Sequence, residues 1–81
     1  MLIKHDEFLI NHNRCDFIEV SGTLIIYNFT YGTRGLMYKE PELAQMAFEK
    51  IVDYLLGGKD FCDVSPSVIS ARAWSKHKEE N

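Results

Sequence analysis

The stretch from Thr23 to Tyr31 has the strongest apolar pattern of the chain, and its β-branched and aromatic residues are typical of a strand. Alternation puts Ile25, Tyr27, Phe29 and Tyr31 on one side of this strand, and Leu24 and Ile26 on the other side with Asn28 and Thr30. A strand with a single covered face alternates apolar with polar residues, and this strand does not. We therefore expect one face to be covered by a helix of the same chain and the other by a partner, a second copy or a ligand.

Shorter strand patterns flank this stretch. Residues 8–10 form a short apolar run, and residues 16–30 are predicted to form a hairpin around the Ser-Gly pair at 21–22. Two glycines within residues 32–35 predict a second turn, because glycine adopts the positive φ angles that tight turns require. Residues 36–39 are then the last strand of an antiparallel meander of three to four strands.

The most regular element is a helix predicted over residues 41–56. Pro41 suits its first turn, since a proline has no N–H to leave unpaired there, and the Gly57-Gly58 pair suits its end. Apolar residues recur on one stripe, namely Ala44, Ala47, Phe48, Ile51 and Leu55, while Glu49, Lys50 and Asp53 lie away from it. We expect the stripe to pack on one face of the sheet, against Ile18, Val20, Leu24 and Ile26.

The C-terminal segment supports two interpretations. Ser65 followed by Pro66 is typical of a helix start and favours a second helix over residues 66–78, although Val68 and Trp74 also fit a strand alternation. We favour the helix. The predicted fold is a single small α+β domain over residues 1–81, in which the meander carries the 41–56 helix on one face and is followed by a short C-terminal helix.

Composition narrows the function classes. The chain has 81 residues, is 46% hydrophobic and 12% aromatic, and carries a formal net charge of −3. A negative net charge argues against non-specific binding to a nucleic-acid backbone, which requires a basic surface. Cys15 and Cys62 are the two cysteines, and with no apolar targeting or bilayer-spanning run at or after Met1 we expect a cytoplasmic protein with reduced thiols.

An aromatic group on the predicted sheet is the leading candidate site for a partner. It consists of Tyr27, Phe29 and Tyr31, with Tyr38 from the next strand and Arg34 at its rim. Tyrosine and arginine are enriched at protein interfaces because they combine a large contact area with polar groups. Two alternatives place this face in the core or beneath the C-terminal segment, with Trp74 as anchor. The same aromatic residues are also suited to stacking single-stranded bases, helped by Arg34, Lys39 and Arg72.

Catalytic and metal sites are weakly indicated. His12, Cys15 and Cys62 carry zinc-binding atoms, which makes a small zinc-supported domain an alternative, but no second pair of ligands completes the site. Neither cysteine lies in a recognisable nucleophile turn with an orienting group. We expect no enzymatic activity, no metal and no cofactor.

No sequence motif identifies a family. In size and style the chain resembles small accessory proteins carried by phages and other mobile elements, some of which inhibit host defence nucleases. We therefore expect a non-enzymatic protein-binding module that acts as a regulator or inhibitor. Homo-oligomerisation is also expected, most simply as a dimer, because a small domain gains stability by burying a sheet face against its copy.

Overall fold

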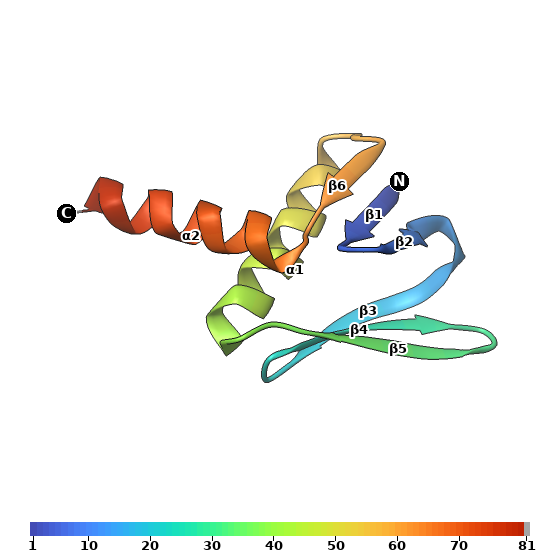
Figure 1. The fold of residues 1–81 in the computed structure, drawn as a ribbon. Coiled ribbons are helices and arrows are strands. Elements are labelled where there is room, and N and C mark those ends of the chain that lie inside the picture. Colours follow the sequence, from blue (N-terminus) through green and yellow to red (C-terminus); the bar gives the residue numbers. More distant parts are fainter. Residues whose placement is uncertain (81) are drawn as a thin grey trace.

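The computed structural model describes the backbone of residues 1–80 and the side chains of residues 1–75. Its elements follow in the order β1 (Leu2–His5), β2 (Phe8–Asn11), the 3₁₀ turn η1 (His12–Arg14), β3 (Cys15–Ser21), β4 (Leu24–Phe29), β5 (Gly32–Met37), α1 (Pro41–Leu56), β6 (Phe61–Asp63) and α2 (Pro66–Glu80). The strands form two three-stranded sheets, which we call the N-terminal sheet (β2-β1-β6) and the meander (β3-β4-β5). Helix α1 lies beside the meander, and α2 packs against α1 and extends away from both sheets (Figure 1).

The predicted α+β class, the antiparallel meander and both helices are confirmed. Helix α1 has the predicted bounds and ends at glycines, where Gly58 adopts a φ of 68°. The predicted hairpin is formed by β3 and β4, and because Ser21 pairs with Leu24 its turn lies at Gly22-Thr23, one residue later than predicted. The C-terminal segment is helical over 66–80, so the strand alternative for it is wrong.

The N-terminal sheet was not expected. Its central strand β1 pairs antiparallel with β2 and parallel with β6. Strand β6 lies about 60 residues further along the chain, and Leu2 is paired with Phe61. The sequence indicated only the apolar run at 8–10 within β2, because the four-residue β1 and the three-residue β6 have too little pattern to be recognised locally. They form here because β6 follows α1 directly and the helix returns the chain to the side of β1.

The second turn of the meander lies earlier than predicted. Phe29 pairs with Gly32, so Thr30 and Tyr31 form the turn and Gly32 to Met37 form the strand. Gly32 has a φ of 153°, which explains the glycine immediately after the turn. Gly35 lies inside the strand, where a Cβ would meet the side chains of Ile26 and Leu24 at van der Waals distance.

The face of β4 that meets α1 is opposite to the predicted one. Ile25 and Tyr27 are fully buried and belong to the same core cluster as Ala44, Ala47 and Ile51 of α1. Leu24 and Ile26 lie on the opposite face and are only half-buried. Ile18 and Val20 do pack against the core, because they pair across the hairpin with Tyr27 and Ile25 and so share their face.

One predicted surface residue of α1 is buried. Lys50 is 7% exposed, and its Nζ donates a hydrogen bond of 2.6 Å to the backbone oxygen of Asp63. Lys50 also lies over the ring of Tyr54, 5.4 Å from its centroid. A buried ammonium group is tolerated only with such partners, and here it joins α1 to β6.

Candidate functional site

The aromatic row of β4 is divided between the core and the surface. Tyr27 is fully buried, Phe29 is half-buried, and Tyr31 at the tip of the following turn is 80% exposed. The prediction that Tyr27 contacts a partner is therefore wrong, because α1 covers that part of the meander. Its hydroxyl is buried with no hydrogen-bond partner among the described residues.

Tyr38 is also a core residue, so its predicted role in binding a partner is wrong as well. Its hydroxyl donates to the backbone oxygen of Val64 at 2.5 Å and lies 3.2 Å from Nδ1 of His5. Since the single phenol proton points to Val64, His5 Nδ1 is the donor in the second contact. Tyr38 follows directly after β5, between the meander and α1. Its contacts with His5 of β1 and with Val64, which follows β6, connect the meander to the N-terminal sheet.

The alternative in which Trp74 covers the aromatic row is wrong too. Trp74 lies on α2 and is 68% exposed. Helix α2 packs on α1, away from the end of the meander that carries Tyr31 (Figure 1).

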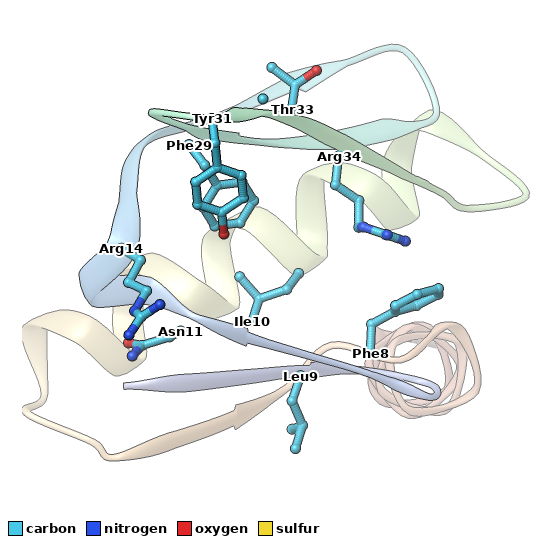
Figure 2. A pocket seen from close by; sticks show the side chains of 10 residues that line it. Phe8, Leu9, Ile10, Asn11, Arg14, Phe29, Tyr31, Thr33 and Arg34 are labelled. Carbon is cyan, nitrogen blue, oxygen red and sulfur yellow. The ribbon is translucent and has the colours of Figure 1, made fainter.

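The remaining predicted residues, Phe29, Tyr31 and Arg34, line a cleft between the two sheets (Figure 2). The cleft has a volume of about 590 Å³. Its walls come from β2 and the adjoining η1 turn on one side and from the β4–β5 hairpin on the other, with these lining residues: Phe8, Leu9, Ile10, Asn11, Arg14, Phe29, Tyr31, Gly32, Thr33 and Arg34. We refer to this feature as the cleft.

Local structure places the side chains on both walls. A two-residue turn at Asp6 and Glu7, with Asp6 at a φ of 54°, folds β2 back along β1. The Asn11 side chain then accepts a 3.0 Å hydrogen bond from the backbone of Asn13, which starts the η1 turn and sets Arg14 at one end of the cleft. On the other wall, the tight turn after Phe29 places the ring of Tyr31 against the ring of Phe29.

Aromatic and cationic groups meet inside the cleft. The rings of Phe29 and Tyr31 stack with a centroid distance of 5.3 Å and an interplanar angle of 12°. The Arg34 guanidinium lies over the Phe8 ring, with its central carbon 4.3 Å from the centroid, so these two side chains join the walls. Figure 2 shows Arg34 and Phe8 at one end of the cleft, Arg14 at the other, and Ile10 between them.

The cleft is locally positive in an acidic chain. Its lining contains two arginines and, among the side chains that the structure describes, no aspartate or glutamate. Neither Arg14 nor Arg34 forms an ion pair with a side chain of residues 1–75, where Lys4 and Asp63 make a salt bridge. Both arginine residues are exposed.

Neither cysteine is among the cleft-lining residues, although Cys15 directly follows Arg14 and pairs with Phe29. Cys62 is buried in β6, and Cys15 is half-buried at the start of β3. Burial raises the pKa of both thiols, and Asp16 adds to the effect at Cys15, so both stay protonated at neutral pH and are weak nucleophiles. Within the described part of the chain, no three histidine, cysteine, aspartate or glutamate side chains gather into a group able to hold a metal ion.

The outer face of the meander is a second apolar surface. It carries Phe17 and Met37, which are 57% and 68% exposed, beside the half-buried Leu24 and Ile26. Asn28 on the same face bonds through its amide to the Phe17 backbone oxygen and to the Glu19 carboxylate, each at 3.4 Å. Unlike the cleft, this face has no cationic residue among its strand positions.

Sequence reasoning missed the wall formed by Phe8 and Arg14. The sequence placed Phe8 in a short apolar run, which the structure shows as part of β2, and it indicated no role for Arg14. Nothing local indicated that β2 lies opposite β5, because that placement depends on how the two sheets pack.

Comparisons with protein-family models, with curated proteins and with solved structures found no match, so they assign the chain to no family. No helix of the described residues is long and apolar enough to cross a membrane.

Proposed function

We propose that this protein is a non-enzymatic protein-binding module whose contact site is the cleft. The observation that carries the proposal is the convergence of two exposed arginines with three aromatic rings in a concave site between two sheets. Aromatic residues and arginine supply most of the binding energy at protein interfaces, above all where neighbouring side chains exclude water. Phe29, Tyr31 and Arg34 keep the role predicted from the sequence, and Phe8 and Arg14 join them.

The absence of enzymatic activity belongs to the same proposal. Among the described residues that line the cleft there is no histidine, cysteine or carboxylate to act as nucleophile or general base. A small chain with a binding cleft and no reacting group acts by occupying a surface of its partner, which is how a regulator or inhibitor works. This agrees with its resemblance to phage and mobile-element accessory proteins.

Two further parts of the proposal concern compartment and assembly. Both cysteines are free, which suits the reducing cytoplasm. The apolar outer face of the meander offers area for a homodimer, and the molar mass of the protein in solution tests this part. A monomer at micromolar concentration would contradict it.

Affinity capture with matched variants tests the contact site. The cleft variant Phe8→Ser/Tyr31→Ser removes one exposed ring from each wall, and the control Leu56→Ser/Trp74→Ser removes two exposed apolar side chains outside the cleft. Circular dichroism establishes that each variant is folded. We expect wild type and control to capture the same protein from a lysate of the source organism and the cleft variant to lose it; if no captured protein is lost with the folded cleft variant, the proposal is wrong.

A further inference from the structure

The two arginines of the cleft lie on opposite walls. Arg34 belongs to β5, whereas Arg14 ends the η1 turn that follows β2, and Figure 2 shows them toward opposite ends of the cleft. Each lacks an ion-pair partner among residues 1–75, in a chain with 12 acidic and 9 basic residues. A ligand that spans the cleft meets a cation at both ends, and guanidinium groups bind carboxylates through paired, charge-assisted hydrogen bonds.

The strands that border the cleft are both at sheet edges. In the described structure, β2 pairs with β1 alone and β5 pairs with β4 alone. Each therefore has a row of backbone N–H and C=O groups that no neighbouring strand occupies. At Gly32 a Cβ would meet no atom within 4 Å, so a second backbone has space to approach β5 there.

From these two features we infer that the cleft takes an extended, acidic segment of the partner protein. The segment lies along the edge of β2 or β5 and hydrogen-bonds to its backbone, and its carboxylates bind Arg14 and Arg34. The stacked rings of Phe29 and Tyr31 cover its apolar side chains. This inference rests on the proposed function and names the chemistry of the partner at the same site.

A single-stranded nucleic acid is the competing anion, because stacked aromatic rings and arginines also bind bases and phosphates. Two features favour the peptide. The net charge of −3 repels a polyanion, whereas a short acidic segment carries only a few charges. In addition, the edge strands match the hydrogen-bonding pattern of a peptide backbone and have no such match in a nucleic acid.

The test is a binding titration followed by backbone amide signals in NMR. The first probe is a peptide of about six residues, the length of an ordinary strand, in which glutamate alternates with threonine so that all carboxylates lie on one face. The second probe replaces every glutamate by glutamine, and the third is a thymidine oligonucleotide. The protein variants are Arg14→Gln/Arg34→Gln and the charge-matched control Lys59→Gln/Arg72→Gln, whose residues lie outside the cleft.

We expect the glutamate peptide to shift amide signals of β2 and β5 saturably. Loss of one charge-assisted contact weakens binding about tenfold, so the glutamine peptide and the Arg14→Gln/Arg34→Gln variant should each bind at least that much more weakly. The control variant should bind as wild type does.

Three results would overturn the inference: no saturable shift with the glutamate peptide, equal binding of both peptides, or unchanged binding by Arg14→Gln/Arg34→Gln. Tighter, steeply salt-dependent binding of the oligonucleotide would also overturn it in favour of nucleic acid. Capture of the partner separates this inference from the proposed function. A partner lost with Phe8→Ser/Tyr31→Ser but kept by Arg14→Gln/Arg34→Gln leaves the cleft as the contact site and rejects the acidic segment.

Discussion

The aromatic row of β4 has two ends with opposite roles. At one end, Ile25 and Tyr27 are completely buried beneath α1. At the other end, Phe29 and Tyr31 continue the same every-second-residue spacing in the sequence, but they line the cleft. Strand β2 forms the other wall of the cleft and does not cover them. Residue type and spacing are similar at both ends. The difference in burial therefore arises from the neighbouring elements, because α1 packs against the core end and the cleft lies over the other end.

This comparison shows that an apolar strand face is not a uniform surface. The core end stabilises the fold and exposes no surface to solvent. The cleft end carries the exposed Tyr31, while the half-buried Phe29 still packs against the core. Substitutions at the two ends should therefore change different measurements, and the size of the effect on stability should follow burial.

The largest effect is expected at the core end. Tyr27→Ser removes a fully buried ring and should lower the free energy of unfolding by about 3–5 kcal/mol, a large share of the stability of a small domain. Urea unfolding followed by circular dichroism measures this change. A well-folded Tyr27→Ser protein with a stability near that of wild type would show that this end is not core.

The next largest effect on stability is expected from removing the hydroxyl of Tyr38, and it should distinguish Tyr38 from the other buried tyrosine, Tyr27. Tyr38→Phe leaves the Val64 carbonyl and the His5 ring without their partner, and should cost about 1–3 kcal/mol of unfolding free energy. Tyr27→Phe is the matched control, because its hydroxyl has no partner within the described structure, and should be neutral or slightly stabilising. Equal losses in urea unfolding would contradict the hydrogen bonding of Tyr38.

A pH dependence should follow from the histidine that joins Tyr38. Burial lowers the pKa of His5 from its ordinary 6.5, against the opposing charges of Asp6 and Asp63, so folding favours the neutral ring. Below pH 6.5 the unfolded chain takes up a proton that the folded protein does not, so stability is full above that pH and falls with acidification through the lowered pKa.

Urea unfolding between about pH 7.5 and pH 5.5 measures this dependence, a window around the ordinary pKa of histidine. Burial acts to raise the pKa of Asp63, but hydrogen bonding with Ser65 lowers it below 3.8 overall. Asp63 therefore does not titrate between about pH 7.5 and pH 5.5. His5→Gln should flatten the dependence, and the control is His12→Gln, at a histidine that is half-buried in the η1 turn, whereas His5 is buried. A steep dependence in the His5→Gln protein would assign the effect to another group.

The smallest effect on stability is expected at the cleft end. Tyr31→Ser changes a side chain that is 80% exposed, and should alter the unfolding free energy by no more than about 0.5 kcal/mol. The same change should weaken capture of the partner while the protein stays folded. A core substitution should weaken capture only by unfolding the protein. A large loss of stability would mean that the stack with Phe29 supports the fold.

The predictable part of this molecule was local. Helix α1 was recognised from its repeated apolar stripe between Pro41 and Gly57, and the β3–β4 hairpin from alternation around a Ser-Gly turn. Both depend on residues within a few positions of each other, where periodicity is informative. The position of the second turn was missed because Gly32 and Gly35 are equivalent in sequence, and only strand pairing shows which one has the positive φ.

The candidate site was predicted in part for the same reason. Phe29 and Tyr31 were predicted from strand alternation and Arg34 from its place at the rim, but Tyr27 and Tyr38 belonged to the same predicted group and are core residues. Phe8 and Arg14 carried no signal at all. A one-residue change of register reverses the buried face of a strand, so the pattern alone does not show which face is exposed.

By itself, then, the sequence determined the elements that depend on near neighbours: the helix, the hairpin, and a strand with two apolar faces. Tertiary structure alone decided the pairing of β1 with β6, the burial of Lys50 and the opposition of β2 to β5. Each of these joins segments far apart in the chain, as does the 2.8 Å hydrogen bond from the Asp6 backbone to the Ser65 hydroxyl, across 59 positions. Such contacts depend on the free energy of packing whole elements together, which no local pattern of residues encodes.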